Sequence, residues 1–141
     1  MITPPSPFDA AFTAFVRGRG LWRDDTAGAV LERWSSFVAE CEQGYRGDEF
    51  AYANEVMSRT TLEAAMREPS LARFPEMGVL RRRVADVDAR FKPLLVEHAF
   101  RGIDVDEWWL RGIVRYAGHR LAREWKQSFG FDVEVVRHSR A

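Results

Sequence analysis

Residues 30–41 read VLERWSSFVAEC, and this stretch decides the fold class. Its apolar side chains recur at steps of three and four residues, which places them in one stripe along a helix; they are Val30, Leu31, Trp34, Phe37, Val38 and Cys41. Asp24, Asp25 and Thr26 offer helix caps before the stretch, and Gly44 ends it. The pattern predicts an amphipathic helix packed in a bundle.

A shorter helix is predicted on the N-terminal side of this stretch. Ser6 is a candidate N-cap, and Pro7 suits the first helical position. Apolar residues then follow at helical spacing, namely Phe8, Ala11, Phe12, Phe15 and Val16. Gly18 and Gly20 allow the left-handed backbone that commonly ends a helix.

Residues 45–69 leave two arrangements open. In the first, Asp48 caps a short helix, and Thr60 forms a capping box with Glu63 that starts another helix. In the second, one long helix runs through the segment with a kink near Ser58.

A further bundle helix is predicted over residues 75–94. Its stripe again follows steps of three and four residues and comprises Met77, Leu80, Val84, Val87, Phe91 and Leu94. Pro75 suits the first turn, and Pro93 should kink or end the helix. Asp86 and Asp88 diverge by about 200° on a helix, so we expect them on a solvated face, with one of them bonded to an Arg.

The last predicted helix begins at Asp104, where Ile103 and Trp108 occupy the two positions of a hydrophobic staple. It continues to Gly130, a candidate C-cap. Its inward-facing residues are Trp109, Ile113, Tyr116, Leu121 and Trp125.

Residues 131–136, FDVEVV, alternate like a β-strand, and a strand needs a partner. Residues 103–105, the linker of residues 43–50 and a second copy of the chain are the candidate partners. Overall we expect a mainly α fold, in which residues 1–141 form a single helical domain of about five helices with a short C-terminal β-strand. Aromatic residues make up 13% of the chain, which predicts an aromatic core.

Composition excludes several classes of function. The 21 basic and 21 acidic residues give a net charge of zero, so no overall field favours nucleic acid or a membrane surface. Cys41 is the single cysteine, which excludes an internal disulfide and a cysteine-based zinc site. The chain shows neither a secretory signal nor a run of apolar residues long enough to span a bilayer. We therefore expect a cytoplasmic protein without a metal or cofactor.

Trp108 and Trp109 are the candidate partner-binding residues. Adjacent residues on a helix project about 100° apart, so we expect one ring in the core and the other at its margin. A marginal ring either anchors a partner or covers a neighbouring helix, and we prefer the second interpretation. The hypothesis that we prefer from the sequence is a non-catalytic protein-binding or regulatory protein, such as an immunity or antitoxin-like inhibitor, with a protein partner or a second copy of the chain.

Two other hypotheses remain. One is a small enzyme or ligand-binding module with a site between helices around His98 and His119, together with Glu97 and Asp104. The other is nucleic-acid binding through a basic helix edge comprising Arg73, Arg81, Arg82 and Arg83. Because three successive residues span most of a helical turn, this edge would not be one flat patch, and nucleic acid is the weakest of the three hypotheses.

The order of aromatic and charged residues resembles a pattern found in small uncharacterised helical proteins of actinobacteria. The resemblance covers roughly residues 30–110 and lies in Trp34..Phe37-Val38, Gly44-Tyr45, Tyr52-Ala53-Asn54, Arg59..Leu62-Glu63, Asp88..Phe91 and Trp108-Trp109. It implies a bacterial cytoplasmic origin and carries no activity with it.

Overall fold

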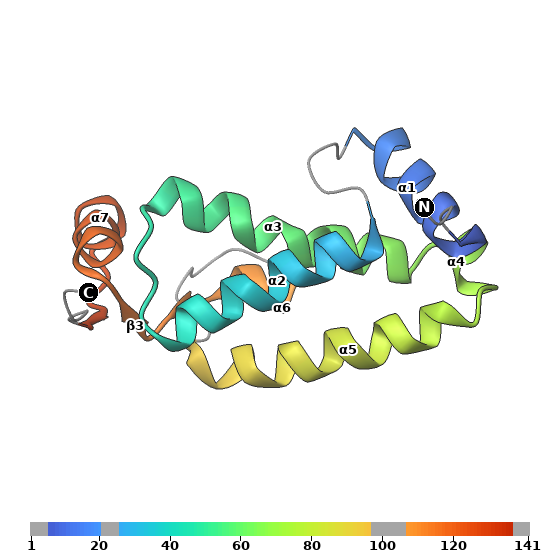
Figure 1. Cartoon of the computed structure of the whole chain (residues 1–141). Helices are drawn as coiled ribbons and strands as arrows, with labels where there is room; N and C mark the ends of the chain where they lie inside the picture. Colours follow the sequence, from blue (N-terminus) through green and yellow to red (C-terminus); the bar gives the residue numbers. More distant parts are fainter. Residues whose placement is uncertain (1–5, 21–25, 97–106, 137–141) are drawn as a thin grey trace, which may run out of the picture.

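Three long helices form the body of the molecule in a computed structural model that describes residues 6–20, 26–96 and 107–136. They are α2 (Ala27–Glu42), α3 (Glu49–Met66) and α5 (Glu76–Phe91). Helix α2 packs against both of the others, and α3 runs in the opposite direction to its two neighbours (Figure 1). The mainly α fold expected from the sequence is confirmed.

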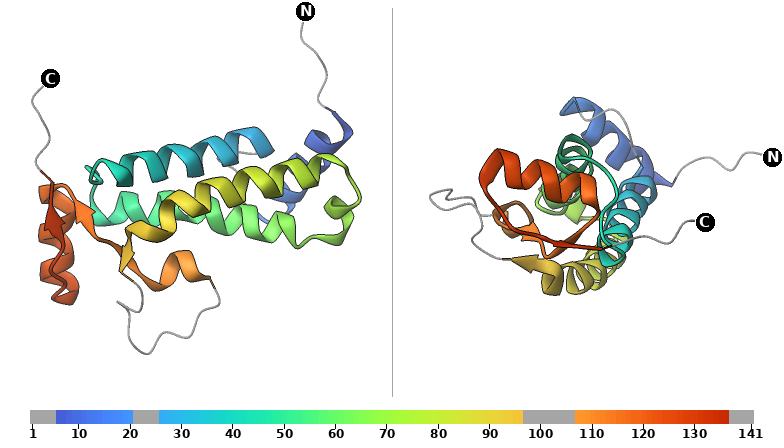
Figure 2. Two further views of the ribbon diagram at one scale, coloured as in Figure 1. Left: turned by 90° about the horizontal axis from the view of Figure 1, so that it is seen from below. Right: turned by 90° about the vertical axis from the view of Figure 1, so that its left-hand side faces the viewer.

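The remaining helices close the two ends of this three-helix body. Helices α1 (Pro7–Gly18) and α4 (Pro69–Ala72) pack together at one end. Helix α7 (His119–Phe129) crosses the other end, and the short helix α6 (Trp108–Arg111) lies alongside α3 (Figure 2). Of the helices in the described ranges, those of eleven residues or more are α1, α2, α3, α5 and α7, in agreement with the expected bundle.

Helix starts follow the capping residues of the sequence. The hydroxyl of Ser6 accepts a hydrogen bond from the backbone N–H of Asp9 at 3.1 Å, and Thr26 caps α2 in the same way. The Asp48 carboxylate caps α3 by accepting from the N–H of Ala51 at 2.7 Å. These side chains satisfy N–H groups that the first turn of a helix leaves without partners.

Helix α3 is continuous from Glu49 to Met66, as the single long helix of the second arrangement requires, whereas the kink expected near Ser58 stays a prediction. The capping box of Thr60 and Glu63 was a wrong prediction, because both residues lie in the middle of the helix. The Thr60 hydroxyl instead accepts a hydrogen bond from the indole N–H of Trp109 at 2.9 Å. Glu63 pairs with Arg59 one turn earlier.

The single helix predicted from residue 104 to residue 130 was also wrong. The chain breaks after α6, with extended backbone at Gly112 (ψ 177°) and again at Gly118 (ψ 171°), before α7 starts. Tyr116 is 37% exposed rather than inward-facing, whereas Gly130 ends α7 in the left-handed conformation, as expected. The expected cap Asp104 and the staple residue Ile103 lie outside the described residues.

Two short strands, β2 and β3, occupy the break between Gly112 and Gly118, and each pairs with a strand from another segment. Strand β1 (Leu95–Val96), which follows a 3₁₀ turn at Lys92–Leu94, pairs antiparallel with β2 (Ile113–Val114). Strand β3 (Tyr116–Ala117) pairs in parallel with the C-terminal strand β4 (Glu134–Val135). The predicted C-terminal strand is therefore present. Its partner is β3, which lies in the segment predicted to belong to the last helix.

Aromatic rings dominate the interior, as the composition predicts. Phe37 lies at its centre, with its ring 5.1 to 5.8 Å from those of Trp34, Tyr45, Tyr52 and Phe91. Cys41 is fully buried in the same core, and burial raises the pKa of its thiol well above the usual value, so it is a packing residue. Among the helices of the described ranges, none combines the length and the apolar character needed to cross a bilayer.

Candidate ligand pocket

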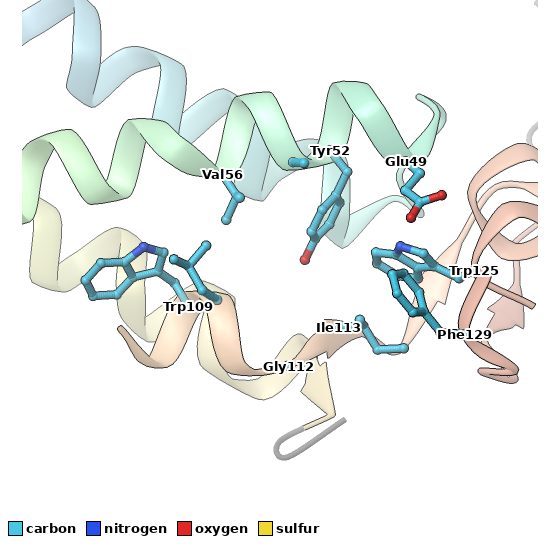
Figure 3. Close-up of a pocket in the computed structure, with 10 residues that line it drawn as sticks. Glu49, Tyr52, Val56, Trp109, Gly112, Ile113, Trp125 and Phe129 are labelled. Carbon is cyan, nitrogen blue, oxygen red and sulfur yellow. The ribbon is translucent and has the colours of Figure 1, made fainter. Parts of the chain in front are cut away.

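An apolar pocket of about 200 Å³ lies where α3, α6, β2 and α7 meet (Figure 3). Helix α3 contributes four residues to its wall, the segment from α6 to β2 contributes four, and α7 contributes two. The lining comprises Glu49, Tyr52, Ala53, Val56, Trp109, Leu110, Gly112, Ile113, Trp125 and Phe129. Apolar walls with few polar groups are typical of small-molecule sites.

The hydroxyl of Tyr52 is the exceptional group in this pocket. Within the described ranges, it is the one buried side-chain nitrogen or oxygen atom that has no hydrogen-bond partner. Figure 3 shows it pointing away from α3, towards Gly112 and Ile113. Burial raises the pKa of this phenol well above its usual value, so the group is an uncharged O–H donor. Buried polar groups almost always have partners, so an unpartnered one needs an explanation.

Neighbouring rings hold Tyr52 in this orientation. Its ring packs edge-on against Trp125 at 4.9 Å, Phe37 at 5.1 Å and Tyr45 at 5.5 Å. The residue is only 7% exposed. Since a close-packed core leaves little room for another rotamer, the hydroxyl cannot turn towards solvent to find water.

Trp109 also lines the pocket, and contacts with two residues of α3 hold its ring in place. Its indole N–H donates to Thr60, and the guanidinium of Arg59 lies 4.3 Å from the centre of its ring. A cation at this distance over an aromatic face is attractive, more so when it is removed from water. Trp109 is 2% exposed, so these contacts are made inside the protein.

Behind Trp109 lies a buried polar cluster that joins the three long helices. Arg59 of α3 binds the carboxylate of Asp88 on α5 with two hydrogen bonds, of 2.9 and 3.0 Å. The indole N–H of Trp34 on α2 donates to the same carboxylate at 3.1 Å. The predicted bond between one of the two aspartates and an Arg is thus confirmed. The solvated position expected for Asp88 was wrong, since it is 7% exposed and only Asp86 lies on the exposed face.

Glu63 completes this cluster from the next turn of α3. It accepts hydrogen bonds from Arg59 at 3.0 Å and from Arg67 at 2.7 Å. Partial burial raises the pKa of its carboxyl, but the bonds to the two guanidinium groups outweigh burial and leave the pKa below its usual value. Glu63 therefore stays charged at neutral pH. It accepts from Nη1 of Arg59, whereas Asp88 accepts from Nε and Nη2 of the same guanidinium.

Polar contacts attach α7 to the start of α3 at the mouth of the pocket. The backbone N–H of Glu49 donates to the carboxylate of Glu124 at 2.6 Å. The hydroxyl of Ser128 donates to the carboxylate of Glu49 at 3.1 Å. These bonds hold Trp125 and Phe129 of α7 against the pocket.

Of the residues singled out from the sequence that the structure describes, Trp109 alone lines this pocket. Trp108 is half-buried, with the Lys92 ammonium 4.9 Å from its ring centre, so one tryptophan lies in the core and one at its margin, as expected. His119 is exposed at the start of α7, whereas His98, Glu97 and Asp104 lie outside the described residues. A role for any of these residues in binding a partner or ligand stays a prediction.

The basic residues proposed for nucleic acid lie on the surface. Arg73, Arg81, Arg82 and Arg83 are all exposed. Arg73 and Arg81 bond to backbone carbonyl oxygens of Ser70 and Met66. Nucleic-acid binding through this edge likewise stays a prediction.

Sequence reasoning missed Tyr52 as a site residue and Arg59 as the partner of Asp88, although a signal was present. Tyr52, Val56, Arg59 and Glu63 follow one another at steps of four, three and four, so they share one face of α3. A face that begins with apolar residues and continues with an Arg and a Glu indicates an ion pair inside the bundle. The described residues contain no group of three or more His, Cys, Asp or Glu side chains arranged to hold a metal ion.

Comparisons with known proteins add no further constraint on this pocket. No protein-family model, curated protein or solved structure matches the chain. The function must therefore be argued from the geometry.

Proposed function

We propose that the chain is a ligand-binding module that holds a small, largely apolar molecule in this pocket, with one hydrogen-bond acceptor placed against the hydroxyl of Tyr52. The observation that carries the proposal is a buried hydroxyl without a partner on Tyr52, a residue in the wall of an apolar pocket, directed towards Gly112 and Ile113 of the same wall. The sequence hypothesis of a site between helices is thus retained, but with other residues.

The unpartnered hydroxyl of Tyr52 destabilises the unliganded protein. Leaving a buried donor unsatisfied costs about 1 to 3 kcal/mol. A phenylalanine at position 52 would pack against the same aromatic rings without that cost. A ligand that accepts a hydrogen bond from Tyr52 removes the penalty, which accounts for the presence of a tyrosine at this position.

Water alone is a poor partner for this hydroxyl. A buried water is typically held by about three hydrogen bonds. Apart from Tyr52, the lining side chains that carry a polar group are Glu49 and the two tryptophans. The indole N–H of Trp109 is already bonded to Thr60.

The size of the pocket limits the ligand to about one substituted ring. A dry cavity of about 150 Å³ is enough to take up benzene, and this pocket measures about 200 Å³. The aromatic rings of Tyr52, Trp109, Trp125 and Phe129 favour a flat apolar body. A monocyclic aromatic molecule with an oxygen acceptor meets both conditions.

We predict that acetophenone binds this pocket and that its affinity depends on the hydroxyl of Tyr52. α-Methylstyrene, which has the same shape with a CH₂ group in place of the carbonyl oxygen, is the matched control. The ratio of the affinities for the ketone and the hydrocarbon should be about fivefold higher in the wild-type protein than in Tyr52→Phe, since one hydrogen bond contributes about 1 kcal/mol. Titration calorimetry or ligand-observed NMR measures both affinities.

The unliganded variant provides an independent readout. Tyr52→Phe should unfold at a higher urea concentration than the wild type, because removal of the unpartnered hydroxyl gains about 1 kcal/mol. A loss of stability in the variant would show that the hydroxyl already has a partner. An equal ketone preference in both proteins would contradict the proposed role of Tyr52.

A further inference from the structure

An acidic groove adjoins the mouth of the apolar pocket. It has a volume of about 460 Å³ and is lined by Asp48, Glu49, Phe50, Ala53 and Glu124. Glu49 and Ala53 also line the apolar pocket, so the two hollows share a wall on the first turns of α3. A ligand in the pocket would reach the groove through a short chain.

The groove carries more negative charge than its surroundings neutralise. Its carboxylates belong to Asp48, Glu49 and Glu124, and Arg120 lies 3.6 Å from the first and 4.0 Å from the last. The start of a helix adds roughly half a positive charge. The three carboxylates therefore leave an excess of roughly one and a half negative charges in the groove. Among the described residues that line the adjoining apolar pocket, Glu49 is the one charged residue.

Local structure accounts for only part of this acidity. Capping α3 requires the carboxylate of Asp48, and Glu124 satisfies the backbone N–H of Glu49. The carboxylate of Glu49 accepts one hydrogen bond, from Ser128, and makes no cap. The side chains of Asp48 and Glu124 are only about 30% exposed, at 30% and 31%, so water screens them less than it screens a surface charge.

We infer that the ligand is an arylalkylamine, whose ring occupies the apolar pocket and whose ammonium group lies in the groove against Glu49 and Glu124. An organic ammonium suits the groove because the carboxylates of the described ranges are not grouped closely enough to hold a metal ion. This inference rests on the proposed function, since the ring and the acceptor that faces Tyr52 are those of the proposed ligand.

Three probes that differ only at the end of the alkyl chain test the inference. They are 4-methoxyphenethylamine, 4-methoxyphenethyl alcohol and 3-(4-methoxyphenyl)propionate, each with a methoxy oxygen for the hydroxyl of Tyr52. At pH 7 the amine should bind about tenfold more tightly than the alcohol, since hydrogen bonds to charged groups are stronger than neutral ones. The anionic propionate should bind more weakly than the alcohol.

Matched variants locate the charge that makes the difference. The double variant Glu49→Gln with Glu124→Gln keeps the hydrogen-bonding groups and should reduce the preference for the amine to twofold or less. Asp86→Asn, which removes an exposed carboxylate from α5, should leave the preference unchanged. Tyr52→Phe should weaken all three probes by a similar factor.

The outcomes separate the two proposals. If the amine and the alcohol bind equally well, and both depend on Tyr52, the ammonium inference is overturned and the proposed function stands. If the double variant keeps the full preference for the amine, the groove is not its origin and the inference is overturned. If none of the three probes binds but acetophenone does, the ammonium inference is overturned and the proposed function stands. If acetophenone does not bind either, both proposals are wrong.

Discussion

Asp88→Ala should lower the free energy of unfolding by about 3 to 5 kcal/mol, the range for breaking a buried ion pair on one side. The substitution leaves the guanidinium of Arg59, 4% exposed, without the carboxylate that binds it through two hydrogen bonds. It also leaves the indole N–H of Trp34 without an acceptor. Small domains have total stabilities of about 5 to 15 kcal/mol, so urea unfolding should show a large shift of the midpoint.

Two controls assign this loss to the unpaired charge. Asp86→Ala, two residues away on the exposed face of α5, should change stability by no more than about 0.5 kcal/mol. The double variant Arg59→Met with Asp88→Leu should recover most of the stability that Asp88→Ala loses, because an apolar pair leaves no charge in the core. A loss of similar size at positions 86 and 88 would contradict the buried cluster.

Trp109→Ala should cost about 3 to 5 kcal/mol, as large-to-small changes of buried aromatic residues do. The variant loses the hydrogen bond to Thr60 and the ring that covers Arg59, and it enlarges the ligand pocket. Indole added to the variant should refill the space and raise its melting temperature, because a ligand that binds only the folded state stabilises it. Differential scanning calorimetry with and without indole measures both effects.

Trp108→Ala is the matched control for this experiment. Trp108 precedes Trp109 directly but is only half-buried, so its loss should cost less stability, and indole should not restore it. A rescue of equal size in the two variants would mean that indole acts elsewhere on the protein. An absence of rescue in Trp109→Ala would contradict the cavity that we expect the substitution to open beside the pocket.

The long bundle helices were predictable because their apolar stripes and their caps agree. The stripe of residues 30–41 and the cap at Thr26 indicate the same element, and the structure has it at Ala27–Glu42. Such agreement between local signals is what specifies a helix in a sequence. The stripe of residues 77–94 likewise ends near Pro93, where the structure replaces α5 with a 3₁₀ turn.

The break between α6 and α7 was not predictable from apolar spacing. Residues 108–125 contain enough apolar side chains to satisfy a helical period, and Gly112 and Gly118 cost a helix only about 1 kcal/mol each. What decides the outcome is pairing with distant segments. The backbone N–H of Arg115 donates to the carbonyl oxygen of Leu94, and the backbone N–H of Gly118 donates to the carbonyl oxygen of Tyr45. These contacts span sequence distances that local rules do not cover.

The candidate pocket could not be predicted from the sequence either, because it too depends on contacts between distant segments. Tyr52 looks like any core aromatic residue in the sequence, because its distinguishing property is an absent partner. That property depends on where Gly112 and Ile113 lie, and therefore on the break after α6. Arg59 and Asp88 were visible as charged residues, but their pairing requires the contact between α3 and α5, 29 residues apart in the chain.

A crystal structure of the protein with acetophenone bound decides whether this pocket is a ligand site in which Tyr52 donates a hydrogen bond. The account predicts the phenyl ring between Tyr52 and Trp109, with the carbonyl oxygen about 2.7 to 2.8 Å from the hydroxyl of Tyr52, the usual length of an O–H···O bond. A pocket that stays empty at saturating ketone, or a ketone whose oxygen faces away from Tyr52, would contradict it.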